Sequence, residues 1–207
     1  MEKSNRAFNE MYMVALKRLE NKSPNDICEK ANVMFCEETS TFKIESLGKT
    51  IELLYPEYKG KKKLNEWYIL ILLHYLDLAD GTALYHKPVH FGELQDGLIR
   101  GVRFDKTAEM ELAKFLSNKK DEEIINTCKA LGGEIIKSKF DLSVIFTLFP
   151  NYLITLNIWF ADEEFAASGQ MLVDKSADHY LTIEDSVMAG EFMLRCLDEK
   201  YKKLYIK

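Results

Sequence analysis

The stretch NYLITLNIWFADEEFAASGQMLVDKSADHYLTIED, residues 151–185, decides the fold. Residues 152–160 are a run of β-branched, leucine and aromatic residues, long enough for a well-buried strand. Three charged residues at 162–164 end this run, and residues 170–173 form a second apolar run. A polar loop at 176–180 follows, and then Thr182 and Asp185 have the spacing of a helix capping box. The sequence therefore predicts a buried hairpin that leads through a histidine-containing loop into the closing helix.

The rest of the chain alternates between helical and strand-like patterns. Apolar spacing, capping residues and glycine stops predict helices over 5–19, from 24 onward, over 64–79, 106–116, 122–131 and 183–197. Short apolar runs predict strands over 33–36, 41–47, 50–55, 134–136 and 142–149, with an extended piece at 88–94. Gly97 and Gly101 are interpreted as punctuating a loop.

These elements predict an α+β fold in a single domain spanning 1–207, with the helices of residues 1–31 as a possible appendage. Short turns between neighbouring strands favour a mainly antiparallel mixed sheet packed by several helices. The segment 64–79 is apolar on most sides, so it is expected to be a buried central helix.

Composition excludes several classes of protein. The 207 residues are 47% hydrophobic and 12% aromatic, which allows a sizeable core, and the net charge of -5 argues against a nucleic-acid partner. The longest strongly apolar stretch, 67–76, is too short to span a bilayer, and the first residues lack the apolar core of a signal peptide. The four cysteines show no CxxC spacing. We therefore expect a cytoplasmic protein with no membrane partner.

His179 is the first candidate for chemistry, because it lies between Asp178 and Tyr180 just before a predicted helix. Histidine in such a loop can be a metal ligand, an axial ligand of haem or a corrin, or a general base. The plainer interpretation is that its ring packs beside Tyr180 and hydrogen-bonds the backbone. Both interpretations stay open on the sequence alone.

His74 is the second candidate and lies on the predicted buried helix. A lone histidine on an apolar face is more often a satisfied core residue than a ligand. If the fold brought it to His179, the pair would make a ligand pocket lined by Trp67, Tyr75 and Trp159, with Tyr180 beside the second histidine.

Seven acidic residues between 162 and 185 face only Lys175 as an opposing charge in that segment. Asp174 and Asp178 with His179 could hold a metal ion, since carboxylate oxygens and imidazole are common ligands. Exposed turns and helix starts also favour acids without any bound ion, and acidic runs are usually solvated. The plainer interpretation is favoured here.

Several segments together resemble a known family. They are ILILLHYL at 69–76 with ADGT at 79–82, FGEL at 91–94, WFADEEF at 159–165, LVD at 172–174, HYL at 179–181 and ED at 184–185. In this order and spacing, over about 67–197, they are similar to a bacterial and archaeal family known as a domain of unknown function, number three-seven-eight-six of its series. The resemblance implies an association with anaerobes. It also implies a link to corrinoid proteins of one-carbon metabolism, because some members carry an added iron–sulfur domain like the one in those proteins.

The resemblance transfers no activity, and two departures from the family stand out. The 207 residues contain no cysteine-rich iron–sulfur segment, and residues 166–168 read Ala-Ala-Ser where the family is usually rich in proline and serine.

Three functions remain in competition. The first is a binding or accessory protein of anaerobic metabolism that holds a tetrapyrrole, haem or corrinoid, through histidine. The second is a metal-dependent enzyme that uses the acidic cluster near His179. The third is a protein-interaction domain without a ligand, with a partner on a strand edge or on the apolar face of the first helix.

Overall fold

The computed structural model describes residues 6–206, and Asn5, where the predicted first helix begins, lies outside them. The helices are α1 (Arg6–Leu19), α2 (Pro24–Ala31), α3 (Glu66–Leu78), α4 (Gly97–Leu116), α5 (Asp121–Ala130) and α6 (Ile183–Tyr205). The strands are β1 (Met34–Cys36), β2 (Thr41–Ser46), β3 (Lys49–Leu54), β4 (Lys59–Gly60), β5 (Pro88–Val89), β6 (Glu134–Ile136), β7 (Leu142–Phe149), β8 (Tyr152–Trp159) and β9 (Ser168–Asp174). Two short 3-10 helices, η1 (Phe91–Glu93) and η2 (Lys175–His179), complete the set. The predicted α+β class is confirmed.

The predicted antiparallel pairing is confirmed, but the strands form two sheets where the sequence predicted a single, mainly antiparallel mixed sheet. The first has the order β1-β2-β3-β4 and the second the order β5-β9-β8-β7-β6. The turn after β2 meets the second sheet, because the Leu47 amide donates to the carbonyl of Thr147 at 2.8 Å. Local turns predict which neighbouring strands pair, but the division into two sheets depends on this long-range arrangement.

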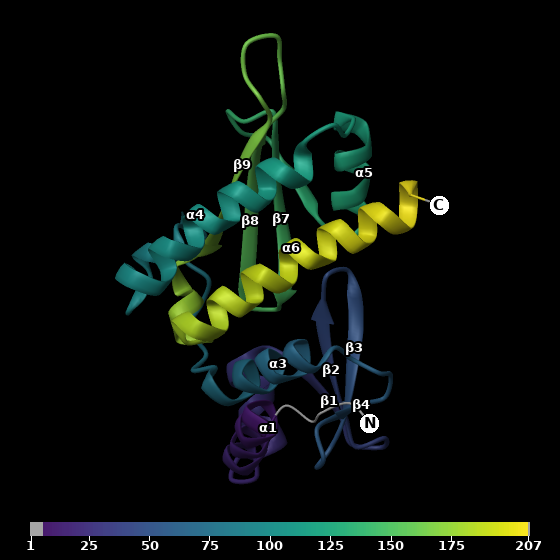
Figure 1. Ribbon diagram of the computed structural model, residues 1–207. Coiled ribbons are helices and arrows are strands. Elements are labelled where there is room, and N and C mark those ends of the chain that lie inside the picture. Colours follow the sequence, from purple (N-terminus) through teal and green to yellow (C-terminus); the bar gives the residue numbers. More distant parts are fainter. Residues whose placement is uncertain (1–5, 207) are drawn as a thin grey trace.

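The predicted buried hairpin is confirmed as β8 and β9. β8 is the middle strand of the five, and Ile154 pairs with Val173 while Trp159 pairs with Ser168. Ile154, Leu156 and Ile158 alternate along β8 and are all buried. Figure 1 shows α4 and α6 lying across one face of this sheet.

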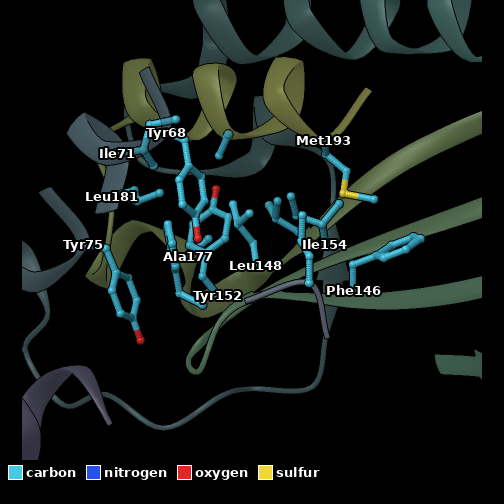
Figure 2. Packing of buried hydrophobic residues seen from close by; sticks show 14 of the residues in the cluster. Tyr68, Ile71, Tyr75, Phe146, Leu148, Tyr152, Ile154, Ala177, Leu181 and Met193 are labelled. Carbon is cyan, nitrogen blue, oxygen red and sulfur yellow. The ribbon is translucent and has the colours of Figure 1, made fainter. Parts of the chain in front are cut away.

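The predicted central helix is confirmed as α3, which contacts α1, α2 and α6. The side chain of Asn65 accepts from the amides of Trp67 and Tyr68 and so caps its first turn. Figure 2 shows Tyr68 and Ile71 of α3 pointing into one buried layer with Phe146 and Leu148 of β7, Ile154 of β8 and Met193 of α6. Ala15 and Leu19 of α1 and Ile27 and Ala31 of α2 belong to the same continuous core.

The interpretation of Gly97 and Gly101 as loop residues is wrong, since α4 begins at Gly97 and runs through Gly101. A Cβ on Gly101 would lie 2.5 Å from the carbonyl carbon of Phe91 and 2.7 Å from the amide nitrogen of Gly92. These glycines let α4 approach the backbone of η1 closely, and they do not break the helix. The predicted extended piece at 88–94 is likewise only β5 followed by η1.

Candidate functional site

A cleft of about 730 Å³ lies where four parts of the chain meet: the end of α3, the segment before α4, η2 and the start of α6. Its polar lining is mostly acidic, with the carboxylates of Asp80, Asp96, Asp178 and Glu184 and the imidazole of His179. Its apolar lining is aliphatic and comes from Leu78, Leu94, Leu181 and Ile183. Clefts that combine an apolar lining with a few polar groups are the usual form of small-molecule sites.

The imidazole of His179 is fixed by residues that follow α3. Its Nδ1 lies 2.7 Å from Oδ2 of Asp80 and 3.1 Å from the hydroxyl of Thr82, while Nε2 lies 3.4 Å from the hydroxyl of Tyr85. Since a carboxylate only accepts hydrogen bonds, Nδ1 donates to Asp80, and Nε2 is the ring nitrogen on the other side, beside the Tyr85 hydroxyl. A histidine that coordinates a metal commonly has a carboxylate at its other ring nitrogen in this way.

Asp80 is held ionised by the same contacts. Partial burial alone would raise the pKa of its carboxyl group, but hydrogen bonds from His179 and Thr82 outweigh it and lower the pKa below its ordinary value. The amide of Thr82 also donates to Oδ1 of Asp80 at 2.9 Å. Asp80 therefore keeps the negative charge that orients the imidazole.

His74 has a carboxylate partner of its own. Its Nδ1 lies 2.7 Å from Oδ1 of Asp185, in the first turn of α6. The other oxygen of Asp185 accepts from the hydroxyl of Thr182 at 2.8 Å, and Thr182 caps α6 as the sequence predicted. His74 is not part of the cleft lining, so only His179 of the two histidines meets the cleft.

The predicted aromatic lining of this pocket is not present. Trp67 packs edge-on against Phe8 with ring centroids 5.6 Å apart, and it lines a separate hollow. Trp159 packs against Phe140 at the end of β8 that leads into the β8–β9 loop. β8 has eight residues and so extends about 25 Å. Its first residue, Tyr152, and its last, Trp159, therefore lie at opposite ends of the sheet.

Tyr75 and Tyr180 are structural in this arrangement, and Asn151 joins them. Their buried rings stack with centroids 5.6 Å apart. The hydroxyl of Tyr75 accepts from the backbone amide of Asn151 at 3.1 Å, and the hydroxyl of Tyr180 accepts from the side-chain nitrogen of Asn151 at 3.0 Å. Tyr180 also donates to the carbonyl of Thr82, which holds the segment after α3 beside η2. Burial raises the pKa of both tyrosines, so both hydroxyls stay protonated.

Asp174 is not free to bind a metal ion. It is 5% exposed and accepts four hydrogen bonds: from the amides of Tyr85 (2.9 Å), Lys87 (3.0 Å) and Ser176 (3.0 Å), and from the Ser176 hydroxyl (2.6 Å). Burial would raise the pKa of this carboxyl group, but these hydrogen bonds outweigh it and lower the pKa. Asp174 therefore joins β5 to β9 and caps η2.

Asp178 is bound to a different part of the fold, since its Oδ2 accepts from the amide of Gln95 at 3.2 Å. Within residues 6–206 no three histidine, cysteine, aspartate or glutamate side chains gather in a way that could hold a metal ion. The structure thus does not assemble the predicted set of Asp174, Asp178 and His179 into one site.

The sequence did not indicate the partners of His179, which are Asp80, Thr82 and Tyr85. The only signal was the segment 79–82, where Asp80-Gly81 follows the buried helix as a stop. Nothing in the spacing showed that this stop would lie beside a histidine 99 positions away in the chain.

A family model described as a domain of unknown function, DUF3786, matches residues 23–196. The chain belongs to this family. All residues of the acidic cleft lie within the part of the chain that DUF3786 covers, whereas α1 lies before it. No curated protein and no solved structure matches this DUF3786 chain. Among the helices of residues 6–206, none has the length and apolar character needed to cross a membrane.

Proposed function

We propose that this DUF3786 protein is a small-molecule binding or accessory protein whose ligand occupies the acidic cleft and meets Nε2 of His179. The contact of 2.7 Å between Asp80 and Nδ1 of His179 carries the proposal, because it orients the ring so that Nε2 can act as an acceptor. Nε2 lies 3.4 Å from the hydroxyl of Tyr85, and a ligand would replace that contact. A proton acceptor for catalysis would need the same arrangement, so an acid–base enzyme is the second candidate.

The charges of the cleft favour one class of tetrapyrrole over the other. Four carboxylates would repel the two propionates of haem, because like charges in a cleft raise the free energy of the ionised forms. A corrinoid carries amide groups around its ring, which can donate hydrogen bonds to carboxylates, and its cobalt accepts imidazole nitrogen. The imidazole of His179 therefore suits the role of an axial ligand to the cobalt of a corrinoid. In place of the predicted aromatic lining, the cleft has the aliphatic side chains of Leu78, Leu94, Leu181 and Ile183.

A metal-dependent enzyme is the weaker alternative. It would require Asp174 to exchange four hydrogen bonds for a metal ion. The proposal also retains a cytoplasmic location and a role in anaerobic metabolism. The four cysteines Cys28, Cys36, Cys128 and Cys196 are free thiols, which suits a reducing compartment.

Titration with aquacobalamin and with haemin tests the proposal by absorbance. We expect a saturable spectral shift with aquacobalamin, because imidazole replaces the water on cobalt, and a weaker or no shift with haemin. His179→Asn should abolish the shift. His86→Asn is the matched control, since His86 lies outside the cleft and asparagine tolerates its positive φ of 52°. An absent shift with the wild-type protein, or an equal shift with His179→Asn, would exclude ligation by His179.

Asp80→Asn tests the orienting role of the carboxylate. We expect it to weaken aquacobalamin binding about 10-fold or more, the usual cost of removing the hydrogen-bond partner of a ligating histidine. Melting curves of the same samples serve as the check on folding. An unchanged affinity in a folded variant would show that Asp80 does not orient the imidazole.

A further inference from the structure

The first half of α4 carries an unusual exposed surface, which we call the α4 surface: Leu98, Ile99, Arg100, Val102, Arg103 and Lys106. Leu98 is 83% exposed and Ile99 is 78% exposed, although both are large apolar residues on a helix. The side chains of the three basic residues make no ion pair within the described part of the chain. Clustered apolar and basic side chains of this kind mark an interaction surface.

The loop between β8 and β9 carries the opposite combination, and we call its residues Asp162, Glu163, Glu164 and Phe165 the hairpin tip. Oδ1 of Asp162 accepts from the amides of Glu164 (2.8 Å) and Phe165 (2.7 Å), and these bonds lower the pKa of its carboxyl group. This turn presents Phe165, which is 70% exposed, next to two glutamates that make no ion pair among residues 6–206. Figure 1 shows the loop extending beyond the helices.

The hairpin tip cannot reach the α4 surface of its own chain. Gly169, close to the tip, lies against Leu112 in the second half of α4. The first half of α4 packs instead against η1, at the other end of the helix. From Leu98 to Leu112 the helix rises about 20 Å at 1.5 Å per residue. The hairpin tip and the α4 surface of one chain therefore do not contact each other.

We propose that the hairpin tip of one copy docks on the α4 surface of a second copy. Phe165 would lie among Leu98, Ile99 and Val102, and the two glutamates would neutralise Arg100 and Arg103. Each copy carries both surfaces, so a two-fold dimer would satisfy both at once. The charges on the two surfaces have opposite sign, as specific association requires.

An anionic membrane is a poorer occupant of the α4 surface. The chain has a net charge of -5, and Asp96 of the acidic cleft immediately precedes α4. A flat anionic membrane would also bring its headgroups close to the carboxylates of the cleft, which would repel them. The acids of the hairpin tip are confined to a few residues and would contact the α4 surface alone. The proposal does not depend on the ligand proposed for the cleft.

Light scattering of the full chain at rising protein concentration gives the first test. We expect the average mass to rise from that of the 24.0 kDa monomer and to fall again with added salt. A wild-type chain that stays monomeric at all concentrations would overturn the proposal. Association with vesicles of anionic lipid that Phe165→Ser leaves unchanged, without self-association, would assign the α4 surface to membranes and overturn it too.

Charge reversal identifies the surfaces involved. Glu163→Arg with Glu164→Arg makes both surfaces of one chain basic, and Arg100→Glu with Arg103→Glu makes both surfaces acidic. We expect each double variant alone to be monomeric and an equimolar mixture to associate again, because every contact in the mixed pair joins opposite charges. Lys62→Glu with Lys63→Glu makes the same change in net charge as the α4 variant on another exposed loop, and it should associate like the wild type.

A mixture that stays monomeric, or a double variant that associates alone, would overturn the proposed contact.

Phe165→Ser provides a separate test of the apolar part of the contact. It should lose association without a change in charge, and its melting temperature should stay near that of the wild type because the side chain is exposed. Unchanged association of Phe165→Ser would count against the proposed docking.

Discussion

Gly101→Ala is expected to lower the free energy of unfolding by about 3 kcal/mol, the upper part of the range for overpacking a tight contact. In an exposed helix the same change would stabilise the protein by about 1 kcal/mol, because alanine is the better helix former. The sign reverses here because the new methyl group would meet backbone atoms of Phe91 and Gly92, which cannot rotate away as a side chain can. α4 and η1 must separate, and α4 must shift on the sheet.

Urea unfolding followed by circular dichroism measures this effect. Glu109→Ala, on the exposed face of the same helix, should change the free energy of unfolding by no more than about 0.5 kcal/mol. A Gly101→Ala protein as stable as the wild type would show that α4 does not approach η1 as closely as described.

Asp174→Ala is expected to cost at least about 3 kcal/mol, since hydrogen bonds to a charged acceptor contribute about 1.5–3 kcal/mol each and four donors lose theirs. The amides of Tyr85 and Lys87 would lose the acceptor that holds β5 beside β9. Asp178→Ala is the matched control, because Asp178 is exposed and accepts only the bond from Gln95 among the hydrogen bonds described. Water competes for an exposed carboxylate, so this change should cost about 1 kcal/mol or less.

The effect of Asp174 should depend on pH. The folded protein lowers the pKa of this carboxyl group below the ordinary value of 3.8, so the folded state favours the ionised form. The contribution of Asp174 to the free energy of unfolding is therefore complete above its pKa in the unfolded state. It is lost as the pH falls through its lower pKa in the folded state. Unfolding curves from neutral pH to below pH 3.8 should show the wild type and Asp174→Ala converging in acid.

A difference in the free energy of unfolding between wild type and Asp174→Ala that persists unchanged in acid would show that the charge of the carboxylate is not what stabilises the fold.

The same samples address the metal hypothesis. A rise in melting temperature with Mg²⁺ or Mn²⁺ that Asp174→Ala abolishes would make Asp174 a ligand after all.

The candidate site was predictable only in part. His179 was identified from its place among acids before a helix start, and the cleft contains it together with Asp178. Trp67 and Trp159 were predicted to line the pocket, and both lie elsewhere. Periodicity places a residue on one face of its own element, but it does not show which other element covers that face.

The sequence by itself determined the elements with strong local signals. The apolar runs predicted β7 and β8, the apolar segment predicted the buried helix α3, and the capping box of Thr182 and Asp185 predicted where α6 begins. These features depend on residues a few positions apart, whose geometry the local backbone fixes.

Only the tertiary structure decided the rest. The division into two sheets, the start of α4 at Gly97 and the pairing of Asp80 with His179 each join segments that are distant in the chain or that touch only after packing. Glycine serves a turn and a close backbone contact equally well, and a carboxylate looks the same in sequence whether it is solvated or orients an imidazole. Packing settles these alternatives, because each depends on which atoms occupy the neighbouring space.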